Sequence, residues 1–338
     1  MTLFVASAIA ATLLCTASLA QDDTLAAQSR AAKGALIAGR YSEAAKLYRE
    51  LAASLPDNPG PRLSLAVALE RGGHPAEAVP ELDRVIRAQP ESFPAWFLLG
   101  LAYQQLGQPE KAIAPLRKAV VLDGSNVQAQ IELADAELVA GDPRRAIDGF
   151  HALAVSHPDM AKAWQGLGLS YVTLGERASK RLNEVAPQSA YWNALLARAR
   201  AAEGRNAEAL SLYGDALRQS PALPGLHAAR ADIYRQTKHT GWAATEEARE
   251  AQVPKPDCST HAAACAYLAG DWSAAVAAAG QNAVPENLYW ASLACARLAD
   301  GNFQRVAALP PSAGIHELLA EADQRTCRRV EAVAEWRK

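Results

Sequence analysis

The stretch Trp96–Ala112, "WFLLGLAYQQLGQPEKA", has the residue pattern of two short helices joined by a turn. Four of its residues share the i, i+3, i+4, i+7 spacing of one helix face. They are Trp96, Leu99, Gly100 and Tyr103. Gly107 suits the end of this helix, because glycine adopts the left-handed backbone conformation at little cost. Pro109 suits the start of a second helix, where a missing amide hydrogen costs least.

The same pattern recurs along the chain with a period of 34 residues. Segment 95–124 matches segment 129–158, and its first half matches 163–177. Four further segments keep the same register, at 39–56, 61–90, 204–221 and 226–250. A repeat of this length predicts supersecondary units that must stack, since no single unit can bury its apolar stripe alone.

These copies resemble the tetratricopeptide repeat, a helix–turn–helix unit of 34 residues. The copy at 93–126 matches it with Trp96, Leu99, Gly100, Tyr103, Gly107, Ala112, Leu116 and Ala119, and the copy at 127–160 with Leu133, Ala134, Gly141, Ala146, Phe150, Leu153 and Pro158. The resemblance implies an all-α fold, an α-solenoid of stacked helix–turn–helix units that forms a right-handed superhelix. It also implies a protein or peptide partner held on the concave face.

We expect three segments along the chain. Residues 1–20 are predicted to be a signal peptide, and residues 21–255 an array of about seven units. Within this array, 161–189 lacks the second half of the pattern after Gly175, so we expect a shortened unit there, with bends near 176–190 and 300–313. Residues 256–338 read as irregular and incomplete units, the last of which is cut within its second helix.

The first segment predicts export. Residues 3–20, "LFVASAIAATLLCTASLA", are apolar and uncharged and end in small residues before Gln21. This pattern predicts signal-peptide cleavage after Ala20 and a periplasmic or cell-envelope location. No lysine or arginine precedes the apolar run, so an uncleaved membrane anchor is the alternative, and only then would a membrane be a partner.

Composition and motifs favour a binding protein over an enzyme. The 34 basic and 36 acidic residues are dispersed, with no basic patch for nucleic acid. The seven histidines lack metal-binding spacing, and no nucleotide-binding or serine-nucleophile motif occurs. We expect no catalytic residues, metal, cofactor or small-molecule substrate, and therefore a non-enzymatic interaction scaffold. The alternative is an accessory region of a larger enzyme or envelope-assembly machine whose other domain lies beyond Lys338.

The cysteines after the leader all fall in the last quarter of the chain, at Cys258, Cys265, Cys295 and Cys327. An even number in an exported chain suggests disulfides, with three possible connectivities. Cys258 directly precedes an expected first helix and Cys265 lies within it. We favour a local bridge between these two, such as the resemblance to exported bacterial repeat proteins implies; buried thiols are the alternative.

In proteins of the family that the chain resembles, the first helix of each repeat lines the concave face through positions 2, 5, 9, 12 and 13. The candidate partner-binding residues at these positions are Leu63, Val67, Arg71, Phe97, Leu101, Gln104, Gln105, Ile131, Asp135, Leu138, Gln165 and Leu169. They predict an apolar groove with a Gln, Arg and Asp rim, suited to an extended or helical peptide. The alternative is that its apolar members pack between repeats.

Overall fold

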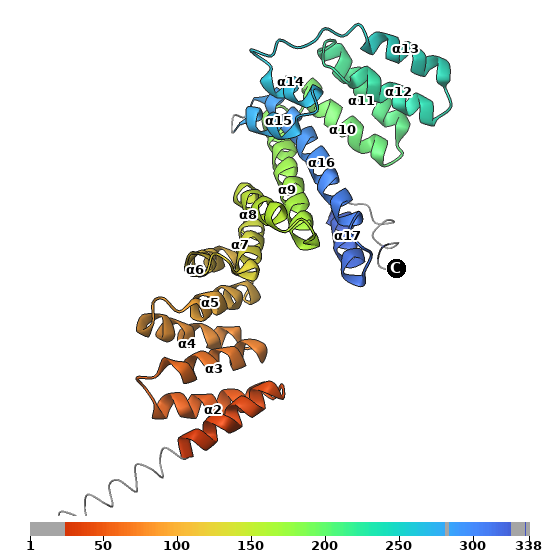
Figure 1. Ribbon diagram of the computed structural model, residues 1–338. Coiled ribbons are helices and arrows are strands. Elements are labelled where there is room, and N and C mark those ends of the chain that lie inside the picture. Colours follow the sequence, from red (N-terminus) through yellow and green to blue (C-terminus); the bar gives the residue numbers. More distant parts are fainter. Residues whose placement is uncertain (1–23, 281–283, 326–334, 336–338) are drawn as a thin grey trace, which may run out of the picture. The chain divides into compact units, whose positions relative to one another are not determined.

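The computed structural model describes residues 24–280, 284–325 and 335, and throughout this part the regular elements are helices (Figure 1). The predicted all-α solenoid of helical repeats is confirmed. The chain divides into two compact units, Met1–Gly149 and Phe150–Lys338. The predicted signal peptide, Cys327 and almost all of the expected last, incomplete helix lie outside the described residues. No helix in the described part is long and apolar enough to span a bilayer.

The first unit consists of helices in consecutive pairs, preceded by a helical segment at 24–37. They are α2 (Tyr41–Ser54), α3 (Pro59–Arg71), α4 (Pro75–Ala88), α5 (Phe93–Gln105), α6 (Pro109–Leu122), α7 (Val127–Val139) and the start of α8 (Pro143–Ser156). The turns follow the repeat. Gly107 has φ +67°, and Pro109 is the first residue of the next helix.

The core of the first unit is made mainly of alanine and leucine. Helices α5 and α6 approach each other closely at Gly100. A Cβ atom at Gly100 would lie 2.4 Å from Cγ of Leu116, so α5 and α6 can approach this closely only with glycine there. Ala112 and Leu116 are fully buried on the facing side of α6. The stretch that first indicated the repeat therefore forms the predicted helix pair.

The second unit begins with the end of α8, and its described residues contain nine further helices. They are α9 (Ala161–Val185), α10 (Ala190–Ala202), α11 (Asn206–Gln219), α12 (Leu226–Gln236), α13 (Thr240–Glu250), α14 (Ala262–Leu268), α15 (Trp272–Ala279), α16 (Pro285–Ala307) and α17 (Ala313–Arg325). Helices α10 to α15 form three consecutive pairs, α10 with α11, α12 with α13 and α14 with α15.

Residues 161–189 do not contain two short helices, because α9 runs through Gly175 as one helix of 25 residues. Its chain reversal comes only after Val185. The residues after Gly175, "ERASKR", include good helix formers and no proline, so nothing local stops the helix. Near 300–313, where a second bend was expected, α16 likewise continues through Gly301 and ends only at Ala307.

Helix α16 supplies the packing partner that α9 lacks in its own repeat, and the two lie side by side (Figure 1). A Cβ atom at Gly168 would lie 2.5 Å from Phe303, and one at Gly175 would lie 3.0 Å from Cβ of Cys295. The hydroxyls of Ser179 and Ser292 are 2.7 Å apart. Later residues of α9 contact earlier residues of α16, so the two helices run antiparallel.

The two ends of this helix pair belong to different cores. At one end, Leu182 of α9 and Trp290 of α16 are buried together with residues of α10 to α15. At the other end, Leu169 of α9 packs with Phe303 of α16 and Ala322 of α17. Residues 186–284 are thus an insertion between two helices that pair with each other.

Candidate functional site

Helices α3, α5 and α7 bring the predicted partner-binding residues of three repeats onto neighbouring helices. The amide nitrogen Nε2 of Gln105 donates to Oε1 of Glu70 at 2.5 Å, which joins α5 to α3. Nε2 of Gln104 donates to the backbone oxygen of Glu132 at 3.1 Å, which joins α5 to α7. These first helices are therefore in contact, and part of the polar rim holds the repeats together.

Most of the predicted residues in the first unit keep some exposed surface. Those that are half-buried are Leu63, Val67, Phe97, Leu101, Gln104, Asp135 and Leu138, and those that are exposed are Arg71 and Gln105. Ile131 is buried, at 9% exposure, and contributes mainly to the core. Phe97 stacks on Phe93 with ring centroids 5.6 Å apart and also packs against Leu116. For Ile131, and partly for Phe97, packing between repeats is thus the better description.

Two exposed apolar side chains extend this surface beyond the predicted set. Val139 is 72% exposed and Ile37 is 77% exposed. Both occupy the same place in the repeat as Arg71 and Gln105, 34 residues apart each time. The register of the repeat could have identified Ile37, because it lies one period before Arg71.

The two predicted residues of the second unit differ in exposure, since Gln165 is buried and Leu169 is half-buried. Gln165 has no exposed surface, and its Nε2 donates to the backbone oxygen of Leu318 at 3.2 Å and to Oε2 of Glu321 at 2.8 Å. Leu169 packs into the cluster that contains Ala322. Helix α17 therefore occupies the face of α9 at Gln165, which is not open to a partner in this structure, while a binding role of the half-buried Leu169 stays a prediction.

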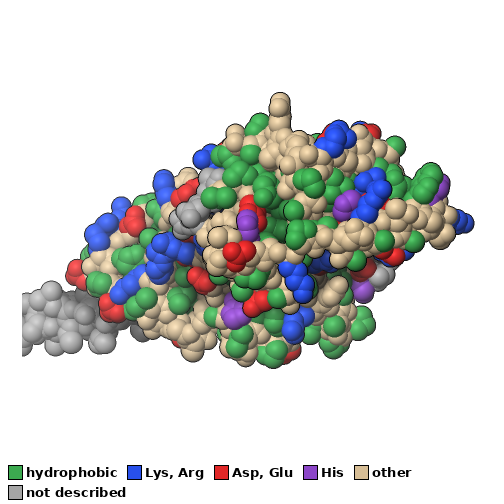
Figure 2. Space-filling model, turned by 90° about the horizontal axis from the view of Figure 1, so that it is seen from above, with side chains coloured by type: hydrophobic (Ala, Val, Ile, Leu, Met, Phe, Trp, Pro, Cys, Tyr) green, Lys and Arg blue, Asp and Glu red, His purple; other side chains and the backbone are tan. Residues whose placement is uncertain are grey.

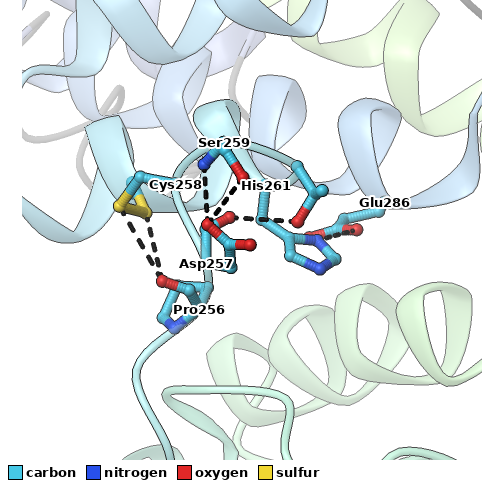
Figure 3. The surroundings of a disulfide bond; sticks show 8 residues. Pro256, Asp257, Cys258, Ser259, His261 and Glu286 are labelled. Carbon is cyan, nitrogen blue, oxygen red and sulfur yellow. Dashed lines mark hydrogen bonds and ion pairs between the residues drawn. A yellow bond between two sulfur atoms is a disulfide. The ribbon is translucent and has the colours of Figure 1, made fainter.

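The predicted disulfide joins Cys258 to Cys265, with Cα atoms 5.6 Å apart (Figure 3). It connects the linker after α13 to the first turns of α14. Both sulfur atoms lie close to the backbone oxygen of Pro256, at 3.8 and 3.6 Å. Nearby, Nδ1 of His261 lies 2.8 Å from Oε2 of Glu286 in α16. The linker is therefore fixed to both α14 and α16.

Charges are mixed over the face of the molecule seen in Figure 2, where basic, acidic and hydrophobic side chains alternate. Several arginines are paired with a carboxylate, for example Arg62 with Glu81 at 3.0 Å and Arg117 with the buried Glu137 at 2.9 Å. Within the described ranges, no group of three His, Cys, Asp or Glu side chains is arranged to hold a metal ion. The surface of α3, α5 and α7 thus offers contact area and hydrogen bonds.

Comparison with known proteins identifies the repeats. A family model of the tetratricopeptide repeat matches residues 63–127 and 131–179. The protein O-mannosyl-transferase TMTC1 of Homo sapiens is 27% identical over 137 residues, which cover 38% of this chain and 15% of that protein. The Hsp70-Hsp90 organizing protein of Triticum aestivum is 32% identical over 121 residues, which cover 35% of this chain and 21% of that protein. The chain thus spans less than a quarter of the length of either relative.

Two solved structures match the chain with TM-scores below 0.5. The crystal structure of MamA gives a TM-score of 0.42 at 19% identity, over 59% of this chain and 92% of that one. A tetratricopeptide repeat protein from Parabacteroides merdae gives 0.41 at 12% identity, over 80% of this chain and 98% of that one. The family match runs from α3 into α9, across the helices that carry the candidate surface. Residues 63–127 and 131–179 therefore match the tetratricopeptide repeat.

Proposed function

We propose that this protein is a non-enzymatic scaffold that binds a partner protein or peptide on the surface formed by α3, α5 and α7. The fold is one that in general serves protein–protein interaction, and one relative is named as an organizer of two chaperones. The observation that carries the proposal is a half-buried apolar stripe with exposed apolar groups beside it. Val67, Leu101 and Leu138 are half-buried, while Ile37 and Val139 are exposed.

The partner that suits this surface is an amphipathic segment. An apolar stripe across parallel first helices can receive the apolar face of a helix or alternate side chains of an extended strand. Arg71 is exposed at one side and can pair with a carboxylate of the segment. Because Gln104 and Gln105 already bridge neighbouring repeats, the surface is held in shape before the partner binds, which lowers the entropic cost of binding.

A matched pair of double variants tests the proposal. The partner is first cross-linked in a cell-envelope extract, identified by mass spectrometry and purified for titration. Ile37→Arg with Val139→Arg should weaken its binding by about tenfold or more, because each places a charge beside the stripe. Val121→Arg with Val155→Arg changes side chains of similar exposure, 73% and 67%, on the second helices α6 and α8. This control should bind normally, and equal loss in both variants would reject the α3–α5–α7 surface.

A second candidate is that the chain serves as the accessory region of a larger enzyme. This candidate is favoured because part of the chain is similar to a protein named as an O-mannosyl-transferase, over 15% of the length of that protein. The gene should then continue past Lys338 into a catalytic domain, and sequencing the transcript beyond this codon tests it. A stop codon directly after Lys338 would exclude a catalytic domain on this side of the repeats.

We also propose that the protein is exported to the periplasm or cell envelope. The apolar run before Gln21 supports this, as does the Cys258–Cys265 disulfide, because disulfides persist in oxidising compartments. Expression with the leader intact, followed by fractionation and intact-mass measurement, should give a periplasmic protein that begins at Gln21. Full-length protein in the cytoplasm would contradict export, and full-length protein in the membrane fraction would indicate an uncleaved anchor.

A further inference from the structure

A hollow of about 440 Å³ lies between α16 and the start of α15 in the second unit. Its lining includes Trp272 from α15 and Arg297, Leu298, Asn302, Gln304 and Arg305 from α16. Gly301 also lines it, and a Cβ atom there would meet nothing within 4 Å, so the space above this turn of α16 is open. The hollow therefore combines aromatic, aliphatic and cationic side chains around an accessible floor.

The two arginines of the hollow carry charge that no carboxylate neutralises within ion-pair distance among the described residues. Both are exposed, and they lie eight residues apart on α16. Some other arginines of the same unit are paired, as Arg205 is with Glu208 at 2.7 Å. Asp300, three residues after Arg297, lines an adjoining hollow with Phe303 and Asp323, and Gln304 lines both hollows. A negatively charged ligand could therefore pair with both arginines without displacing a carboxylate of this chain.

Arg305 is held in position before any ligand binds. Its guanidinium carbon lies 4.7 Å from the centroid of the Trp164 ring. Trp164 is fixed in turn, because its Nε1 donates to the backbone oxygen of Pro158 at 2.9 Å. A guanidinium that stacks on an aromatic face keeps the N–H groups of its edge available for a carboxylate. Binding at Arg305 thus costs less side-chain entropy than binding at an unsupported arginine.

The floor of the hollow is apolar and well supported. Trp272 and Leu298 are half-buried and pack on a cluster that contains Ala275 and Ala294. The side-chain nitrogen of Asn302 donates to the backbone oxygen of Leu298 at 2.7 Å, within α16. A ligand that covers this floor must therefore offer apolar groups between its negative charges.

We propose that this hollow binds an acidic, amphipathic peptide segment of a protein partner. Two of its carboxylates pair with Arg297 and Arg305, and an apolar side chain between them covers Trp272 and Leu298. Eight residues of helix rise by roughly 12 Å, which matches two separate carboxylates better than one small anion. Two arginines are also fewer than the clusters of basic residues that bind anionic bilayers. The site is independent of the surface formed by α3, α5 and α7.

The test uses the whole protein and a short fluorescein-labelled peptide in which two glutamates, eight residues apart, flank leucines. Fluorescence anisotropy should show binding that weakens with added salt, because exposed charge pairs are screened. A peptide with glutamine in place of glutamate should bind about tenfold more weakly or worse. Equal binding of the two peptides would overturn the proposal.

Matched variants separate this site from general attraction. Arg297→Gln with Arg305→Gln should weaken binding by about tenfold, and Trp272→Ala should weaken it with little change in salt dependence. Arg87→Gln with Arg177→Gln removes two exposed arginines elsewhere and should change binding less than about twofold. Ile37→Arg with Val139→Arg should leave this binding intact even if it abolishes the proposed scaffold function. Equal loss in the Arg87 and Arg177 control would overturn the proposal, as would displacement of the peptide by millimolar inorganic phosphate or by phosphatidylglycerol vesicles.

Discussion

Gly168 of α9 faces the ring of Phe303 in α16, although the two residues are 135 positions apart in the sequence. A Cβ atom at Gly168 would lie 2.5 Å from Cε1 of this ring, closer than carbon atoms approach without displacement. Phe303 is buried, at 5% exposure, with Leu169 and Ala322 packed around it. The absence of a side chain at one position of α9 therefore permits the pairing on which the second unit depends.

Gly168→Ala should destabilise the second unit by about 1–3 kcal/mol, because it overpacks a filled core. Urea unfolding followed by circular dichroism measures the change. Gly301→Ala is the control, since it lies inside α16 with open space above it. Alanine there should raise stability by about 0.5–1 kcal/mol through its better helix propensity. Equal effects of the two substitutions would contradict the close contact between α9 and α16.

Gln165→Ala should loosen α17. The substitution leaves the backbone oxygen of Leu318 and the carboxylate of Glu321 without their donor, at a cost of about 1–3 kcal/mol. Amide hydrogen exchange should accelerate in α17 while the exchange in α3 and α5 stays unchanged. Unaltered exchange in α17 would show that this contact contributes little to holding it on α9.

Loss of the Cys258–Cys265 disulfide should destabilise the second unit by about 2–3 kcal/mol, the value for a short loop in the chain-entropy description. Urea unfolding of Cys258→Ser with Cys265→Ser measures this loss. Before reduction, alkylation of the unfolded wild-type chain should leave these two thiols unmodified, and after reduction the mass should rise by two further labels. Labelling of both thiols without reductant would exclude the bridge.

Stability should fall at alkaline pH because of buried tyrosines. Burial, and then the proximity of Tyr213 and Tyr267, raise the pKa of Tyr289 far above its usual range. The folded state thus retains a proton that the unfolded state releases near pH 10, so this stabilisation is complete below about pH 10 and is lost as pH rises further. Urea midpoints between about pH 8 and about pH 11 should fall less steeply for Tyr289→Phe than for wild type. Identical slopes would contradict the prediction.

Local sequence patterns were sufficient to predict the helix pairs, but they did not predict which distant segments pack together. Gly107, followed at once by Pro109, marks a turn that the repeat predicts and the structure contains. Gly175 has the same position in the repeat, but Arg177 stands where the other repeat has Pro109. The residues after Gly175 favour a helix, so α9 continues. Whether a glycine ends a helix was thus decided by its neighbours rather than by its place in the repeat.

For the candidate surface, too, the sequence was sufficient to place residues of neighbouring repeats together and insufficient to predict contacts with distant helices. Residues of α3, α5 and α7 lie on adjacent repeats, and the period alone places them together. Gln165 and Leu169 occupy equivalent positions, yet α17, more than 140 residues later in the chain, covers Gln165 and packs beside Leu169. The hollow at Arg297 and Arg305 also needs tertiary structure, because Trp272 and Trp164 come from different helices.

The pairing of α9 with α16 has a consequence during synthesis. Helices of the first unit meet their partners within a few tens of residues, so they can pack as they leave the ribosome. The face of α9 at Gly168 must wait until Phe303 has been made, and at about 5–20 residues per second this delay is on the order of ten seconds. For that interval the glycine-lined face of α9 is open to water and to other chains. The nascent second unit is therefore the part of this protein with most need of a chaperone.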